Sequence, residues 1–217
     1  MYRAVIFDFD GTIIDTEQHL YETVNRYLNE AGHANMSADF YRSNIGGRAL
    51  GIHQHLLTHL GEMLTDQVYQ EHYETAGQLP LRHGVLELMQ QLHQRHIPMG
   101  IASSSTRHHI ESLVQKLGIE KYISVIKGRE DVETVKPAPD LYLAAVQALN
   151  YSPTHCLAIE DSVNGATGAT GAICAGLDVI VNSNQFTAQS DFSELDLLAK
   201  DVDLSQVVAQ YFDGVQR

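Results

Sequence analysis

The sequence predicts an α/β fold, in which a parallel sheet is wound with helices and a helical segment interrupts the chain after the first strand. Short apolar runs without polar alternation, typical of central strands covered on both faces, recur along the chain. Stretches with the period of amphipathic helices separate these runs. One long stretch after the first run has only helical periodicity, which predicts a helical insertion into the α/β core.

The first strand is expected at Ala4–Phe7, and the chain then turns at Gly11. From there the period becomes helical, and apolar residues at helix-face spacing predict helices over about 17–31, 52–63 and 66–76. No strand pattern interrupts these three stretches. The segment is therefore expected to be entirely helical.

Strands and helices alternate in the remainder of the chain. The expected strands are Met99–Ala102, Ile123–Lys127, Cys156–Ile159 and Val179–Val181, and the expected helices cover about 85–92, 110–117 and 141–149. This alternation predicts that residues 1–15 and 82–217 form one discontinuous α/β core and that residues 16–81 form a helical domain. Because the insertion follows the first strand, it would overhang the crevice at the carboxyl ends of the strands as a lid.

The composition is that of an ordinary soluble globular protein, with 217 residues of which 44% are apolar. A formal charge of -13 argues against nucleic acid, which selects basic surfaces. No apolar run approaches the roughly 18 residues of a membrane span, and the N-terminus resembles a strand rather than a signal peptide, so a cytoplasmic protein is expected. The two cysteines, Cys156 and Cys174, are expected to be free thiols, and nothing suggests an obligate assembly, so we expect a monomer.

Two carboxylates, Asp8 and Asp10, come directly after the first strand. Residues i and i+2 of an extended segment share a face, so both can point into one crevice at the sheet edge. Two such anions repel each other unless a cation or a shared proton intervenes, and a divalent metal is the expected remedy. The structural alternative is an acid-rich turn with a helix cap at Asp15 or Thr16.

Other polar residues lie at the ends of predicted strands or just before predicted helices. Ser103 ends the second strand, where its hydroxyl and the backbone N–H groups that follow, beginning with Ser104, can hold phosphate oxygens, although a helix cap is the simpler alternative. Lys136 lies between prolines before a helix and can neutralise charge on a transferring phosphoryl group, or it is a solvated surface lysine. Glu160 and Asp161 close the strand at 156–159 and suit Mg²⁺, or they cap the next helix.

Taken in order, these residues resemble the four motifs of the haloacid dehalogenase (HAD) superfamily. The matching residues are Asp8 and Asp10 within a complete Asp-x-Asp-Gly-Thr motif, Ser103, Lys136, and Glu160 with Asp161. The resemblance covers essentially the whole chain. The chain is similar to the subfamily that contains phosphoglycolate phosphatase and β-phosphoglucomutase. In that subfamily a helical cap domain is inserted between the first and second motifs. This resemblance implies a Rossmann-like core and a mobile four-helix cap.

The resulting hypothesis is Mg²⁺-dependent phosphoryl transfer through an aspartyl-phosphate. Asp8 would attack phosphorus, and Asp10 would protonate the leaving oxygen and later activate water. Ser103 and Lys136 would hold the remaining phosphate oxygens. The resemblance also implies that the backbone carbonyl of Asp10 faces the metal. The expected metal ligands are Asp8, Asp10, Glu160 and Asp161.

The final phosphoryl acceptor, water or a sugar hydroxyl, separates a phosphatase from a mutase. A mutase must hold a bisphosphate, so its cap needs cationic groups. This cap has no lysine, and its arginines are Arg26, Arg42 and Arg48. By resemblance, the loop with Gly47 and Arg48 faces the active site and could bind one distal anionic group of the substrate. A phosphatase acting on a small phosphomonoester, of sugar or polyol type, is therefore the leading prediction, with a mutase second. A dehalogenase, which needs neither Asp10 nor the metal acids, and a non-catalytic binding module are disfavoured.

Two features stand apart from these motifs. The tandem Gly-Ala-Thr repeat at 165–170 makes the segment after Asp161 longer than is usual in the family. Three extra residues in a helix would rotate the residues beyond them by about 300° about the helix axis.

Several histidines lie in the insertion. His55 and His59 have metal-ligand spacing but no expected third ligand, so surface or lid packing is predicted, and His19 could touch substrate without an assigned chemical role.

Overall fold

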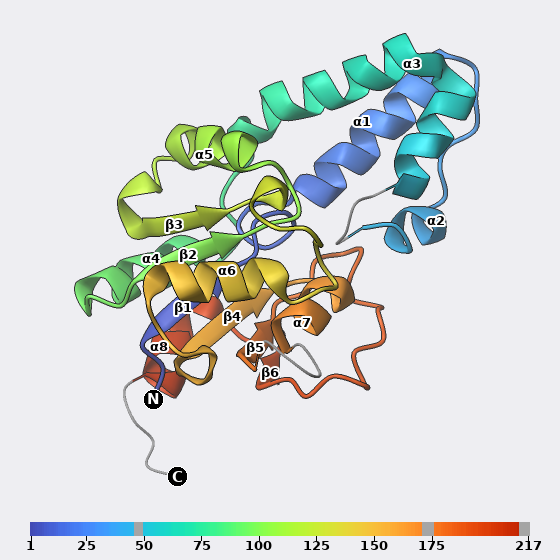
Figure 1. Cartoon of the computed structure of the whole chain (residues 1–217). Helices are drawn as coiled ribbons and strands as arrows, with labels where there is room; N and C mark the ends of the chain where they lie inside the picture. Colours follow the sequence, from blue (N-terminus) through green and yellow to red (C-terminus); the bar gives the residue numbers. More distant parts are fainter. Residues whose placement is uncertain (46–49, 171–175, 213–217) are drawn as a thin grey trace.

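The computed structural model describes residues 1–45, 50–170 and 176–212 (Figure 1). A parallel six-stranded sheet with the order β3-β2-β1-β4-β5-β6 forms its centre. The strands are β1 (Ala4–Phe7), β2 (Met99–Ala102), β3 (Ile123–Lys127), β4 (Cys156–Glu160), β5 (Asp178–Val181) and β6 (Ala199–Lys200). The predicted α/β class is confirmed.

Helices cover both faces of this sheet and form a separate group beside it. The α-helices are α1 (Thr16–Glu30), α2 (Ala38–Arg42), α3 (Leu50–Thr75), α4 (Val85–Gln94), α5 (Arg107–Lys116), α6 (Asp140–Leu149), α7 (Val163–Thr170) and α8 (Val207–Tyr211). The 3₁₀ turns are η1 (Ala76–Gln78), η2 (Glu120–Tyr122), η3 (Arg129–Asp131), η4 (Pro153–His155) and η5 (Leu204–Gln206). None of the helices among the described residues is long and apolar enough to span a membrane.

Strand β1 lies between β2 and β4 and is completely buried, which explains its unbroken apolar sequence. Val5 and Phe7 point into a core shared with α4, α5 and α8. Ala4 and Ile6 point to the opposite face, into a core shared with α6 and α7. Because both faces are covered, β1 holds the loop that follows it in a fixed position.

Helices α1, α2 and α3 form the helical insertion, which we define as residues 16–75 and which stands to one side of the sheet in Figure 1. Asp15 caps α1 by accepting a hydrogen bond from the backbone of Gln18 at 3.2 Å. Helix α3 is interrupted at Gly61, whose positive φ of 72° favours glycine, and this divides the helix near the predicted gap. The insertion has its own apolar core, made by Val24, Leu28, Met36, Tyr41, Ile45, Ile52, Leu56 and Val68, and closed by Phe186 from the loop after β5.

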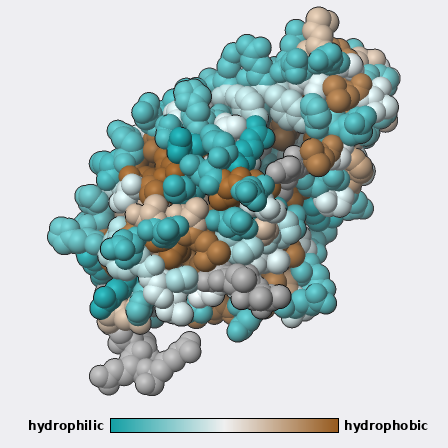
Figure 2. Space-filling view, in the orientation of Figure 1, coloured by the Kyte–Doolittle hydropathy of each residue, from teal (hydrophilic) through white to brown (hydrophobic). Residues whose placement is uncertain are grey.

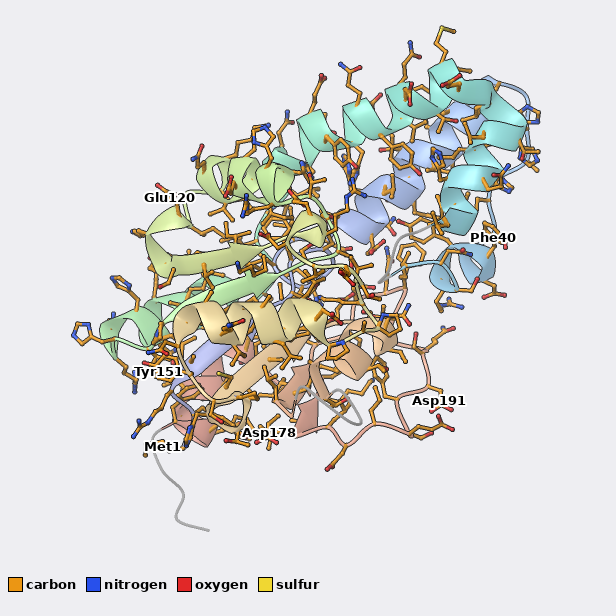
Figure 3. All side chains as sticks on the ribbon, in the orientation of Figure 1. Met1, Phe40, Glu120, Tyr151, Asp178 and Asp191 are labelled. Atoms are coloured by element: carbon orange, nitrogen blue, oxygen red, sulfur yellow. The ribbon has the colours of Figure 1, made fainter. Side chains whose placement is uncertain are left out.

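The chain enters and leaves the helical insertion at neighbouring points. An antiparallel bridge joins Ile14 to Leu81, and the backbone of Arg82 donates to Ile13 at 2.9 Å. Both crossings therefore lie beside the end of β1. Met1, Tyr151 and Asp178 lie at the opposite end of the core from the insertion in Figure 3.

The exposed surface is mainly polar. Figure 2 shows hydrophilic side chains over most of the visible face, with hydrophobic ones in smaller patches between them.

His55 and His59 stack with their ring centroids 4.1 Å apart, and the His33 ring lies against His59. Among the described residues, no group of side chains that could hold a metal ion occurs at these histidines. The Gly-Ala-Thr repeat is helical within α7 as far as Thr170, and residues 171–175 lie outside the described residues, as does Cys174.

Candidate active site

A crevice of about 420 Å³ lies between the carboxyl ends of the strands and the helical insertion. Side chains from both parts line it, including Asp8, Asp10, Lys136 and Asp161 from the core. This is where ligands bind in open α/β sheets, and the volume falls in the range of small-molecule sites. The predicted residues of the first, third and fourth motifs therefore meet in one cavity.

Asp8 is the most constrained acid of this crevice. One carboxylate oxygen, Oδ1, accepts a hydrogen bond from Lys136 Nζ at 2.5 Å. The other oxygen, Oδ2, is buried and has no hydrogen-bond partner among the described residues. Burial raises the pKa of Asp8 to about 7, against the lowering effect of Lys136. A buried, unpartnered carboxylate oxygen is costly, so Oδ2 is suited to a cation or an incoming phosphorus.

Lys136 is buried between two carboxylates. Its Nζ lies 2.5 Å from Asp8 Oδ1 and 2.6 Å from Glu160 Oε1, and 4.9 Å from the centre of the Tyr142 ring. Burial opposes the lysine charge, but Asp8 and Glu160 outweigh it and raise the pKa of Lys136. The lysine is therefore a fixed cation beside Asp8 and not a solvated surface charge.

Both carboxylate oxygens of Glu160 accept hydrogen bonds. Oε1 accepts from Lys136 and from the hydroxyl of Tyr142, and Oε2 accepts from the backbone N–H of Asp161 at 3.1 Å. Gly165 is required beside it, because a Cβ there would lie 2.0 Å from Glu160 Oε1. The first glycine of the repeat thus permits α7 to pass against the carboxylate.

Asp161 lies beside Asp8, held by Asn184 Nδ2 at 2.6 Å and Thr12 Oγ1 at 3.4 Å. Burial, and then the negative charge of Asp8, raise the pKa of Asp161 well above its usual range. Oxygens of Asp8, Glu160 and Asp161 all lie within 4.8 Å of one another. Such clustered carboxylates can hold a divalent cation.

Asp10 points away from that carboxylate group. Its Oδ1 accepts from Thr16 Oγ1 at 3.0 Å, and its Oδ2 accepts from Ser103 Oγ at 3.1 Å and Ser105 Oγ at 2.7 Å. Ser103 is fully buried, and its hydroxyl is engaged by Asp10. The neighbouring hydroxyl of Ser104 is buried without a partner among the described residues, and Ser104 lines the crevice. The free hydroxyl at this strand end is therefore that of Ser104. The predicted cap-loop residues Gly47 and Arg48 lie outside the described residues.

Several crevice residues were not predicted from the sequence. The insertion contributes Glu17, His53, Tyr69, His72 and Tyr73, and the core contributes Arg129 from η3. Burial raises the pKa of Glu17 to about 8, and its Oε2 accepts from the hydroxyl of Tyr41 at 2.9 Å. Of this group, Glu17 alone adjoins a motif, so its position after Asp15-Thr16 could have pointed to it.

Arg129 is a cation at the rim of the crevice. The acids that follow it are engaged elsewhere: Glu130 accepts from the backbone of Arg107 at 2.8 Å, and Asp131 accepts from the Arg107 side chain at 2.9 Å. Within the described ranges, the guanidinium of Arg129 forms no ion pair. It remains available to an anionic group.

The fold and the four groups of polar residues define a hydrolase of the HAD type, and comparisons with known proteins agree. Residues 5–181 match the family model of haloacid dehalogenase-like hydrolases. YhcW of Bacillus subtilis, a phosphatase by name, is 32% identical over 203 residues, covering 90% of each chain. Validoxylamine A 7'-phosphate phosphatase of Streptomyces hygroscopicus is 29% identical, covering 93% of this chain and 95% of its own.

A solved structure supports the same conclusion. CbbY from Rhodobacter sphaeroides, crystallised with xylulose 1,5-bisphosphate, superposes with a TM-score of 0.75 at 25% identity, covering 94% of this chain and 96% of its own. The chain therefore belongs to the haloacid dehalogenase-like hydrolase family, and it is an enzyme of the phosphatase class within it.

Proposed function

We propose that this enzyme is a Mg²⁺-dependent phosphatase that hydrolyses a small sugar or polyol phosphate through an aspartyl-phosphate on Asp8. The observation that carries the proposal is the state of the Asp8 carboxylate. Its Oδ1 is fixed by Lys136, while its buried Oδ2 has no partner among the described residues. A nucleophile held by a fixed cation on one oxygen and free on the other is oriented for in-line attack.

The donor set fits Mg²⁺, which prefers a few carboxylates together with water and substrate phosphate. Oxygens of the buried carboxylates of Asp8, Glu160 and Asp161 lie within 4.8 Å of one another, so one cation can contact this group. We assign Asp8 and Asp161 as ligands, with the backbone carbonyl of Asp10 as the family resemblance implies. Glu160 belongs to the same group, and with both oxygens already engaged its main role is to position Lys136. When bound, the cation offsets the repulsion between the carboxylates and the phosphate.

In the first step, the Asp8 oxygen forms a bond to phosphorus while the bond from phosphorus to the substrate oxygen breaks. Asp10 gives its proton to that leaving oxygen. In the second step, Asp10 takes a proton from water, which attacks phosphorus and restores the Asp8 carboxylate. Lys136 stabilises the charge on the transferring group, and the hydroxyl of Ser104 donates to a phosphate oxygen.

A cap function belongs to this proposal for residues 16–81, which comprise the helical insertion and the segment that returns the chain to the core. Thr16, the first residue of α1, donates to Asp10, so the insertion contacts the acid–base residue directly. Arg42 donates to the backbone carbonyl of Phe186 at 2.8 Å, which joins the insertion to the core on the other side. Movement of the insertion would break both contacts and open the crevice.

The relatives support the proposed substrate class, and the charges of the insertion support a phosphatase over a mutase. The relatives include a phosphatase named for validoxylamine A 7'-phosphate and a protein crystallised with a sugar bisphosphate. The described cations of the insertion give little support to a mutase, because Arg26 pairs with Glu30 and Glu71, and Arg42 pairs with Asp39. These two arginines are thus engaged and are not among the crevice-lining residues.

The experiment is phosphate release from a panel of sugar and polyol phosphates with and without Mg²⁺, with the Asp8→Asn variant as control. We expect release that needs both the metal and Asp8. Conversion of β-glucose 1-phosphate to glucose 6-phosphate without net phosphate, in the presence of a bisphosphate primer, would replace the phosphatase by a mutase. Turnover by Asp8→Asn would overturn the mechanism.

A further inference from the structure

Two histidines of the helical insertion are in direct contact beside the crevice. Nδ1 of His19, on α1, lies 2.8 Å from Nδ1 of His72, on α3, and the ring centroids are 4.9 Å apart. The other nitrogen of His19, Nε2, lies 3.0 Å from the hydroxyl oxygen of Thr75. The three side chains therefore form a hydrogen-bonded row that ends at the crevice, which His72 lines.

Thr75 determines which atoms donate and which accept in the hydrogen bonds of this row. Thr75 Oγ1 lies 2.7 Å from the backbone carbonyl oxygen of Glu71, the usual separation of an O–H···O hydrogen bond. Because a threonine hydroxyl has one proton, Thr75 donates to Glu71 and must accept from His19. His19 therefore carries its proton on Nε2.

The rest of the row follows from the chemistry of neutral imidazole, which has one N–H and one bare nitrogen. With its proton on Nε2, His19 has a bare Nδ1 that accepts from His72. His72 accordingly carries its proton on Nδ1, and its Nε2 is bare. Within the described part of the chain, His72 Nε2 has no hydrogen-bond partner, and it is not among the fully buried polar atoms.

The surroundings keep both rings neutral near pH 7. Burial lowers the pKa of His72 to about 4, the neighbouring His19 acts in the same direction, and Asp10 opposes them. Burial also lowers the pKa of His19, against Glu22 and Glu71. The remaining histidine that faces the pair is His109, which also disfavours a charge on His72.

We infer that the bare Nε2 of His72 accepts a hydrogen bond from a substrate hydroxyl, which makes His72 a specificity-determining residue for hydroxylated phosphomonoesters. The ligand in this inference rests on the proposed phosphatase function, whereas the protonation pattern of the two rings does not. His72 belongs to the insertion, and the phosphate site belongs to the core, so the hydroxyl would lie on the part of the substrate beyond the phosphate.

The crevice has room for such a substrate. A water molecule occupies roughly 30 Å³ of liquid, so about 420 Å³ holds much more than one phosphate group. A phosphomonoester without hydroxyls would leave His72 Nε2 without a partner, and a recognition site built for a hydroxyl discriminates against a compound that lacks it. His19 is a positioning residue, because its Nδ1 accepts the hydrogen bond that keeps the His72 proton on Nδ1 and so leaves His72 Nε2 bare.

The first test compares His72→Phe, which keeps a planar ring and removes the acceptor, with the matched control His59→Phe on the same helix. Each variant is assayed on ribose 5-phosphate, sn-glycerol 3-phosphate and p-nitrophenyl phosphate. For His72→Phe we expect kcat/KM to fall about tenfold on the best hydroxylated substrate and to stay within about threefold on p-nitrophenyl phosphate. An equal loss on both kinds of substrate, or no loss on either, would overturn the inference.

The second test needs no turnover. Long-range ¹⁵N–¹H NMR spectra of the imidazole groups distinguish the two neutral forms, with resonances assigned through His72→Phe. We expect His72 to carry its proton on Nδ1 and His19 on Nε2, and Thr75→Val to produce a mixture of forms at His19. A His72 ring protonated on Nε2 in the unaltered protein would overturn the inference even if the phosphatase is active. Absence of phosphatase activity with the expected spectra would refute the proposed function alone.

Discussion

Replacement of Lys136 by methionine tests the buried charge arrangement around Asp8. The substitution keeps most of the side-chain volume and removes the cation that lies 2.5 Å from Asp8 and 2.6 Å from Glu160. Removing one partner of a buried ion pair typically costs about 3 to 5 kcal/mol, because the remaining charge is left uncompensated. We expect a loss of that size in the free energy of unfolding at pH 8, in metal-free buffer.

The pH dependence of this loss follows from the Asp8 carboxyl. Its folded-state pKa is about 7, above its ordinary value of 3.8, so its contribution to stability is present at low pH and is lost as the pH rises. Between pH 6 and pH 8 the unaltered protein therefore loses about 1 kcal/mol of stability from this group. Without Lys136 the pKa of Asp8 rises further, so the folded variant keeps this proton to higher pH and loses more stability over the same interval. The difference in stability between the two proteins should therefore be larger at pH 8 than at pH 6.

The assay is urea denaturation at both pH values in the presence of a chelator, with Lys121→Met as control. Lys121 is exposed, and its replacement should change the free energy of unfolding by no more than about 0.5 kcal/mol. A Lys136→Met protein that is as stable as the control at pH 8, or whose deficit is the same at pH 6 and pH 8, would refute the reasoning.

Three other predictions concern the crevice. Gly165→Ala, which would normally strengthen a helix by up to about 1 kcal/mol, should instead displace Glu160 and lower kcat at least tenfold; unchanged kinetics would show that the close contact is not needed. Asp161→Asn should raise the Mg²⁺ concentration for half-maximal activity by at least tenfold, as measured by metal titration of phosphate release, whereas an unchanged titration would remove Asp161 from the ligand set. Arg129→Gln should raise KM for phosphomonoesters that carry a second anionic group and leave KM for glycerol phosphate nearly unchanged, and a uniform effect would assign Arg129 a structural role.

The sequence predicted the core well, because the strands of a covered parallel sheet have a distinctive composition. Ala4–Phe7, Met99–Ala102 and Ile123–Lys127 have the predicted bounds, and the two other predicted strands, β4 and β5, are each one residue longer than predicted. Strand β6, with two residues, and helices α2 and α8, with five each, are too short to show a period.

Site residues that directly follow a strand could be predicted from the sequence. Site residues whose position depends on the packing of loops and helices over the strand ends could not. Asp8 and Asp161 meet because β1 and β4 are neighbours in the sheet. The placement of Asn184 against Asp161, and of Tyr142 against Glu160, depends on how a loop and a helix pack over the strand ends, and neither has a local pattern. The sequence alone also gave no reason to expect that Ser103 would be engaged by Asp10.

The measurement that bears most directly on the proposed mechanism is a search for the covalent intermediate on Asp8. The enzyme would be mixed with its best phosphomonoester and Mg²⁺, quenched in acid within milliseconds, and digested for mass spectrometry. We predict the added mass of one phosphoryl group on Asp8, absent without Mg²⁺ and absent in Asp8→Asn. A phosphoryl group on another residue, or rapid turnover in which the Asp8 peptide is never modified, would contradict this mechanism.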